Sequence, residues 1–287
     1  MSFLSAIGFI MAGSGLEELY STVYAKNSVQ QMMNGKAYSR AIRALFLVEE
    51  ALLTVFLKTS EAFIGVAKDD LKFVYSTIKC GNASSEEIMQ SATVKSFVEI
   101  LENQLQLSKE FGRTQKLWIQ FIDMVELVRM FIKAERSGDF RLHLYCVHQM
   151  LPIFHASGHL NYAKSAHVYL QDSLELLNSK SPENDLYVKS GYFTIRRTEK
   201  FWSGVWSDMT IEQVLMRSLS SIGGLTGGRG ITDTTIATWI NSMPVCSRVC
   251  EAIEEYAGVH SLSSEQHVEL REARQKRNCK DLQTFIS

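Results

Sequence analysis

Residues 114–138 read TQKLWIQFIDMVELVRMFIKAERSG, and this stretch decides the fold class. Large apolar residues recur in it at steps of three and four, the period of a helix with one buried face: Trp118, Phe121, Ile122, Val125, Val128 and Ile132. Thr114 supplies an N-cap, and Ser137-Gly138 supplies a stop. The stretch therefore predicts a long amphipathic helix at the centre of a mainly α protein.

The helical pattern continues on both sides of this stretch. Further helices are expected over 35–58, 67–79, from Ser84 towards Phe111, from Asp139 to Pro152, over 162–177, from Ser207 or Asp208 to Leu219, over 232–256 with a break near Pro244, and over 263–285. The predicted core residues are Trp118, Phe121, Phe131, Leu144, Tyr162 and Tyr169. Tyr192 to Ile195 has the composition of a strand, so at most one small β element is expected, near residues 192–197. We predict a helical domain over 1–260 and a polar terminal helix or tail over 261–287.

Composition excludes several protein classes. Of the 287 residues 46% are hydrophobic and 21% are charged, as in a folded globular protein, and the net charge of −1 argues against a surface that is basic throughout. The five cysteines are odd in number and scattered, which favours reduced thiols in an intracellular protein. No apolar run approaches the ~20 residues that span a bilayer, so no membrane contact is expected.

The first residues form an apolar patch of Phe3, Leu4, Ile7, Phe9, Ile10 and Met11, in which Gly8 is expected to interrupt any helix. We expect this patch to pack only partly against the rest of the chain. The surface left over predicts self-association.

Two carboxylates stand out in the second half of the chain. Asp208 and Glu212 are four residues apart, so a helix would place them on one face. They are either an N-cap with an acidic first turn, or a pair of oxygen ligands for Mg²⁺ in phosphoryl transfer. A complete nuclease would need a further acid such as Asp123 or Glu126.

A glycine-rich loop follows this acidic pair. The sequence Gly223-Gly224-Leu225-Thr226-Gly227-Gly228-Arg229-Gly230 is either a helix connection or a phosphate cradle, in which Gly227, Gly228 and Arg229 would contact the anion. No Lys-Ser or Lys-Thr pair follows the last glycine, so the loop is not a Walker A motif.

Basic residues surround the acidic pair: Arg196, Arg197, Lys200, Arg217 and Arg229. Together with Trp202 and Trp206 they predict either a contact surface for a DNA or RNA backbone or a solvated face. The terminal basic residues Arg271, Arg274, Lys276, Arg277 and Lys280 alternate with acids, which favours a solvated helix face. The histidines His143, His148, His155, His159 and His167 are more consistent with core, capping or hydrogen-bonding roles than with zinc.

Seven segments resemble a family of mobile-element-borne proteins of animal genomes, with a more distant fungal branch. These segments are Ser2–Glu18, Asn34–Ala44, Phe131–Leu144, Ala156–Gln171, Ile211–Ser218, Gly223–Thr232 and Ser264–Arg274. The resemblance implies a transposase-like or recombinase-like role, within a ribonuclease-H-like transferase that carries a helical insertion. Glu212 would then be the last metal-binding carboxylate.

The resembling proteins look longer at both ends, and their acidic Gly-Asp-Gln motif lies upstream of the part that matches this chain. We therefore expect a partial or inactive derivative of a transposon-encoded protein that binds nucleic acid weakly and uses no cofactor. The alternatives are a non-enzymatic helical interaction module and a metal-dependent nuclease that uses Mg²⁺.

Overall fold

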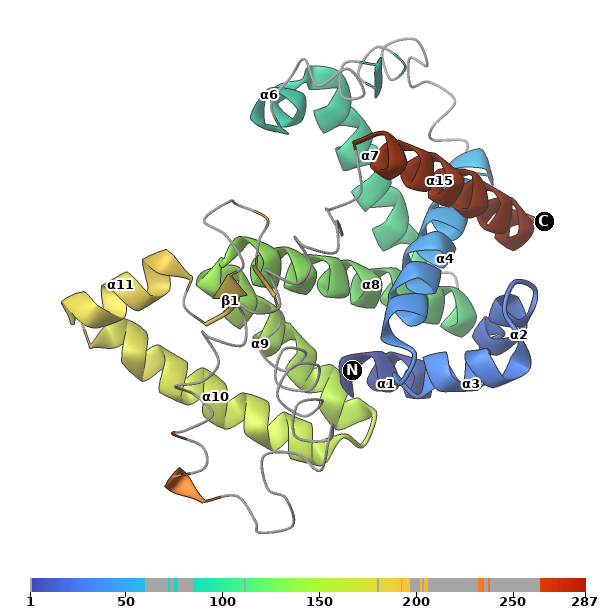
Figure 1. The fold of residues 1–287 in the computed structure, drawn as a ribbon. Helices are drawn as coiled ribbons and strands as arrows, with labels where there is room; N and C mark the ends of the chain where they lie inside the picture. Colours follow the sequence, from blue (N-terminus) through green and yellow to red (C-terminus); the bar gives the residue numbers. More distant parts are fainter. Residues whose placement is uncertain are drawn as a thin grey trace. The chain divides into compact units, whose positions relative to one another are not determined.

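The protein is mainly α-helical in its computed structural model (Figure 1). The structure describes residues 2–59, 72, 75–76, 85–110, 112–179, 181–191, 193–196, 202, 204–205, 232–234, 237 and 264–287. Among these residues no helix is long and apolar enough to cross a membrane. The chain forms two compact units, residues 1–129, 147–169 and 278–287 (unit 1) and residues 130–146 and 170–277 (unit 2), and each is described by itself.

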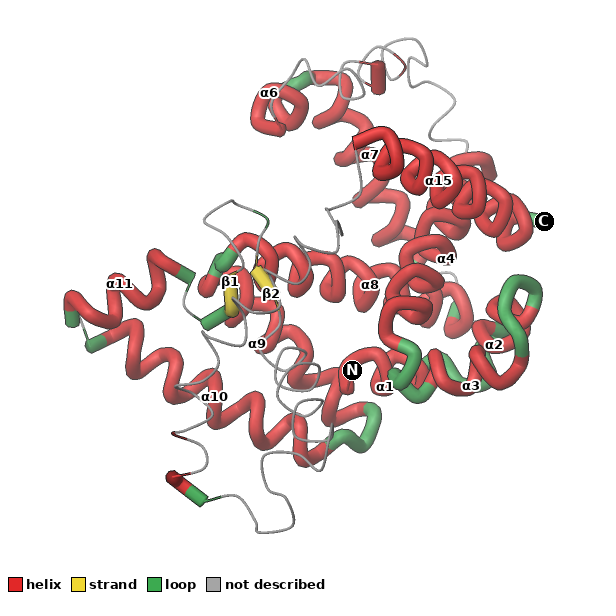
Figure 2. The backbone as a smooth tube through the Cα atoms, in the orientation of Figure 1, coloured by secondary structure: helices red, strands yellow, loops and turns green. Residues whose placement is uncertain are grey.

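The helices of the first half are α1 (Ser2–Ile10), α2 (Leu16–Ser21), α3 (Lys26–Met33), α4 (Tyr38–Thr59), α6 (Ser85–Gln90), α7 (Ala92–Ser108) and α8 (Arg113–Ser137). Those of the second half are α9 (Phe140–Ala156), α10 (Leu160–Asn178), α11 (Pro182–Ser190) and α15 (Ser264–Ile286). Two short strands, β1 (Ile195–Arg196) and β2 (Gly204–Val205), pair antiparallel. Figure 2 separates the helices from these strands by colour.

The core of unit 1 holds fully buried side chains from several helices, among them Ile7, Met32, Val48, Phe121 and Val125. Helix α3 packs against α1, α2 and α4. Helix α1 runs through Gly8, so the expected interruption there is wrong. A Cβ atom on Gly8 would lie 2.1 Å from the backbone oxygen of Met33, which shows that the glycine permits close approach of α1 to α3.

The apolar first residues pack more completely than the sequence alone indicated. Phe3, Leu4, Ile7 and Met11 are buried, while Phe9 remains 62% exposed. Phe3 meets Phe154 edge-on at a centroid distance of 5.8 Å. The apolar surface of this segment is therefore reduced mainly to Phe9.

The central helix and its successor follow the sequence closely, except that α8 begins at Arg113, so Thr114 lies inside its first turn and is not the predicted N-cap. Helix α8 ends at Ser137, where Gly138 takes a φ of 75°. The backbone N–H of Leu142 donates to the Asp139 carboxylate at 3.0 Å, which confirms Asp139 as the cap of α9. Pro152 lies inside α9, however, and does not end it.

Two other predictions needed correction, and a further group lies outside the described residues. The helix expected from Ser84 towards Phe111 is two helices, because Ser91 adopts an extended ψ of 128° between α6 and α7. Of the predicted core residues, Phe121 and Leu144 are buried as expected. Tyr162 is 51% and Tyr169 37% exposed, so these two do not belong to the core. The helices expected over 67–79, from Ser207 to Leu219 and over 232–256, and the boundary at 260, lie largely or wholly outside the described residues.

Candidate functional site

Most residues of the predicted site lie outside the described part of the chain. These are Arg197, Lys200, Asp208, Glu212, Arg217, Gly227, Gly228 and Arg229. Arg196 is described as a backbone position in β1, and Trp202 is described as 55% exposed. The structure therefore describes the two strands that stand on either side of this basic stretch, both within unit 2.

The two strands form a short antiparallel ladder. Ile195 pairs with Val205 and Arg196 pairs with Gly204 (Figure 2). Residues 197–203 stand between the two strands in the sequence. This connection reads RTEKFWS and contains Arg197, Lys200 and Trp202. Strand β1 lies within residues 192–197, where the sequence predicted one small β element; among the described residues 193–196 the strand comprises Ile195 and Arg196.

Two glycine contacts fix the hairpin to the corner between α8 and α9. A Cβ atom on Gly204 would lie 2.0 Å from the backbone oxygen of Glu135. A Cβ atom on Gly191 would lie 2.8 Å from the Cα atom of Gly138. Real Cβ atoms cannot approach so closely, so both contacts require glycine. The Arg136 guanidinium also donates from Nη1 to the Gly204 carbonyl at 3.1 Å.

A histidine–glutamate pair lies in the same unit. His143 Nδ1 lies 2.6 Å from Glu135 Oε1, and the two side chains are only 12% and 8% exposed. Phenylalanine rings enclose the imidazole, with Phe193 at a centroid distance of 4.8 Å and Phe131 at 5.2 Å. Such an enclosed pair is poorly placed to reach a substrate, and the imidazole packs against Phe193, two residues before β1.

His159 is held by hydrogen bonds to two serine hydroxyls. His159 Nδ1 lies 2.9 Å from the Ser157 hydroxyl, and its Nε2 lies 3.3 Å from the Ser5 hydroxyl. His148, His155 and His167 are exposed. Among the described residues no three histidine, cysteine or acidic side chains gather as metal ligands. The hydrogen-bonding interpretation is thus confirmed for His159.

The acids considered as a third nuclease carboxylate have basic neighbours in unit 1. Asp123 lies 3.4 Å from Lys109, and Glu126 lies 3.3 Å from Arg129.

Cys146 is buried, and burial raises the pKa of its thiol to about 11, with Asp139 adding to the shift. The Cys146 thiol therefore stays protonated at neutral pH and is a poor nucleophile.

Sequence reasoning missed the residues that hold the hairpin. No role was predicted for Glu135 or Arg136, and Gly138 was predicted only to stop a helix. A faint indication was that Gly191 and Gly204 flank the basic stretch. Their partners could not be named because the contacts join residues more than fifty positions apart.

Comparison with known proteins places the chain in a family. Neither the curated proteins nor the solved structures give a match. A family match covers residues 1–287, the whole chain described above. The chain belongs to the family described as a domain of unknown function, DUF8702.

Proposed function

We propose that this protein binds the phosphate backbone of DNA or RNA through the β1–β2 hairpin, without catalysing a reaction on it. The observation that carries the proposal is the anchored base of the hairpin, with Gly204 against Glu135 and beside Arg136. A basic segment held at both ends loses less conformational freedom on binding than an unanchored one.

The residues between the strands have the chemistry that such binding needs. Arg196, Arg197 and Lys200 supply cations for phosphate contact within five residues. Trp202 is 55% exposed and offers a face on which a base can stack. The net charge of −1 makes the binding local to this segment and therefore weak and strongly dependent on salt.

The absence of catalysis is the second part of the proposal. Phosphoryl transfer by two metal ions uses several convergent carboxylates, and the sequence supports the pair Asp208 and Glu212. The resemblance to mobile-element-borne proteins supports descent from a transposase-like protein whose active site is not retained. Purified protein with Mg²⁺ or Mn²⁺ is expected neither to cut nor to join labelled DNA. Metal-dependent cleavage that Glu212→Ala abolishes would contradict this part.

Fluorescence anisotropy with labelled 20-mers of single-stranded DNA, duplex DNA and RNA tests the binding. The Arg196→Ala/Arg197→Ala variant should bind more weakly and lower the slope of log affinity against log salt by about 1.8 on duplex DNA, because each lost phosphate contact removes ~0.9. The matched control is Arg271→Ala/Arg274→Ala, which removes two exposed arginines from α15. Equal effects of the two variants would show that binding follows overall charge rather than the hairpin.

A charge-neutral variant tests the anchoring itself. Gly204→Ala places a methyl group 2.0 Å from the Glu135 backbone oxygen and should displace the hairpin. The substitution removes no positive charge. We expect at least a fivefold loss of affinity with an unchanged helical circular dichroism spectrum. Gly158→Ala is the control for backbone strain alone, because the φ of 73° at Gly158 disfavours alanine while nothing lies within 4 Å of the added methyl group. Binding that survives Gly204→Ala would separate recognition from the anchored hairpin.

A helical protein-interaction module is the alternative function. It is favoured by large apolar side chains that α10 leaves in solvent, among them Leu160 at 53%, Tyr162 at 51% and Val168 at 55% exposed. Exposed apolar patches often mark protein contacts. If the hairpin variants leave nucleic-acid binding unchanged, this alternative gains support.

A further inference from the structure

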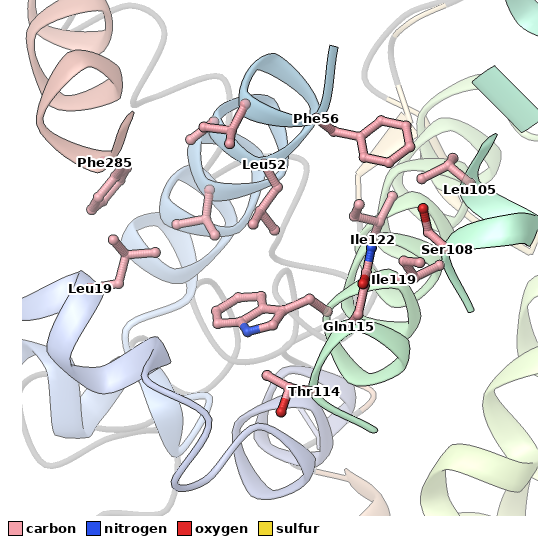
Figure 3. Close-up of a pocket in the computed structure, with 14 residues that line it drawn as sticks. Leu19, Leu52, Phe56, Leu105, Ser108, Thr114, Gln115, Ile119, Ile122 and Phe285 are labelled. Carbon is pink, nitrogen blue, oxygen red and sulfur yellow. The ribbon is translucent and has the colours of Figure 1, made fainter. Parts of the chain in front are cut away.

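Unit 1 contains an apolar cavity of about 440 Å³. Its walls come from α2, α4, α7 and α8, and Phe285 of α15 lies against it (Figure 3). The close-up shows Leu52 of α4 on one side and Ile119 and Ile122 of α8 on the other, with the Phe56 ring on the same side of the view as Ile122. Every lining residue belongs to unit 1.

The cavity has apolar walls and a polar rim. Leu52, Phe56, Trp118 and Ile122 line it and are each only partly buried. Thr114 and Gln115 line it too, in the first turn of α8, and both are exposed, so this end reaches solvent. A molecule inside would meet hydrocarbon along its length and hydrogen-bonding side chains at one end.

The volume of the cavity limits the size of the molecule that it can hold. Because the cavity opens to solvent, its apolar walls contact water unless another molecule covers them, which favours an apolar occupant. At the ~30 Å³ that each water takes in the liquid, 440 Å³ holds about fifteen heavy atoms. The volume also falls in the range typical of small-molecule sites.

We propose that this cavity binds an amphiphile with a single alkyl chain of about twelve carbons. The chain lies between α4 and α8, and the polar end meets the Thr114 hydroxyl and the Gln115 amide. Binding removes from water the apolar walls that the unfilled cavity leaves partly exposed. This site does not depend on the nucleic-acid proposal, because it uses no residue of the hairpin.

Titration calorimetry of the full chain tests the site with three probes, each kept below its micellar concentration. Dodecanoate and dodecanol represent free amphiphiles, and lauroyl-lysophosphatidylcholine represents an acyl chain held in a lipid. We expect saturable 1:1 binding of at least one probe, and the probe that binds identifies the source of the chain. Failure of all three to bind saturably would overturn the proposal.

Two substitutions connect the binding to this cavity. Val55→Trp fills the space from a lining position that is already 40% exposed, and should weaken binding at least tenfold. Leu107→Trp is the matched control on a side chain 56% exposed that does not line the cavity, and should change binding less than twofold. Equal effects of the two variants would overturn the site.

A third variant keeps the test valid if the tryptophan variant folds poorly. Leu52→Ala removes three heavy atoms from the wall and should move the preferred chain length from about twelve to about fifteen carbons, at one heavy atom for each ~30 Å³. A length preference that stays fixed would show that the chain lies elsewhere.

Discussion

Glu49 is an acidic side chain buried inside unit 1, with only 4% of its surface exposed. The guanidinium of Arg129 forms an ion pair with it and also lies over the Phe46 ring, 4.2 Å from the centroid. Burial nevertheless raises the pKa of the Glu49 carboxyl above its usual value, because desolvation outweighs the attraction to Arg129. The contribution of Glu49 to the free energy of unfolding should therefore fall as pH rises from the unfolded pKa of ~4.3 through the higher folded pKa.

Arg129→Met should show how much Arg129 offsets the cost of burying the Glu49 carboxylate. The substitution keeps apolar contact with Phe46 but removes the positive charge, which should cost about 3 kcal/mol at pH 7 and less near pH 4, where Glu49 is protonated. Urea unfolding followed by circular dichroism at both pH values measures this difference. Glu126→Gln, on the half-exposed second partner of Arg129, should stay within about 0.5 kcal/mol. Equal losses at the two pH values would assign the effect to packing.

Gly8→Ala should destabilise unit 1 although alanine is the better helix former. The propensity gain is about 1 kcal/mol, but the new methyl group would lie 2.1 Å from the Met33 backbone oxygen, so α1 and α3 must separate. We expect a net loss of about 2 kcal/mol, in the range of overpacked cores. Chemical denaturation measures it, with Phe9→Ala on the exposed neighbour as the control. A stabilised Gly8→Ala variant would mean that the two helices are not in close contact.

At the scale of elements, the end of α15 returns to α4 (Figure 1). Arg43 donates to Asp281 at 2.5 Å, to Asn278 at 2.8 Å and to the Tyr24 hydroxyl at 2.7 Å. Phe285 is buried one turn further on. These contacts explain why a helix as polar as α15 is held against the rest of unit 1.

Arg43→Ala should release this end of α15. The variant loses three hydrogen bonds to side chains that are partly buried, which should cost about 2 kcal/mol. Hydrogen exchange should then rise in residues 278–287 before the rest of unit 1. Arg40→Ala removes an exposed hydrogen bond to Ser28 from the same helix and should leave that exchange unchanged. Unchanged exchange in both variants would show that Phe285 alone holds the helix.

The sequence predicted the long helices well, but it did not predict where helices break or which distant residues meet. The apolar periods of α4, α8 and α10, the Asp139 cap and the extent of α15 follow from neighbouring residues, so a single sequence reveals them. The break at Ser91 and the continuation of α9 through Pro152 were missed, because the local preferences of serine and proline do not fix where a helix ends. The hairpin anchors could not be predicted either, because Gly204 meets Glu135 only after folding.

At the scale of the whole molecule, the association state remains a prediction. The near-zero net charge does little to keep copies apart, and Phe9 is the large apolar side chain that α1 leaves exposed among the described residues. We expect light scattering to show concentration-dependent oligomers that Phe9→Ser reduces. Leu186→Ser, on a side chain 56% exposed in α11, is the control. A monomer at all concentrations would contradict the prediction.

The return of α15 also has a consequence during synthesis on the ribosome. Unit 1 takes residues from 1–129, 147–169 and 278–287, so about a hundred residues of unit 2 emerge before its last piece. At ~5–20 residues per second, the nascent chain waits roughly 5–20 s with Arg43 and the Phe285 side of the cavity uncovered. A ribosome that stalls or terminates within that interval releases a chain with an open apolar cavity, a form that chaperones and proteases recognise.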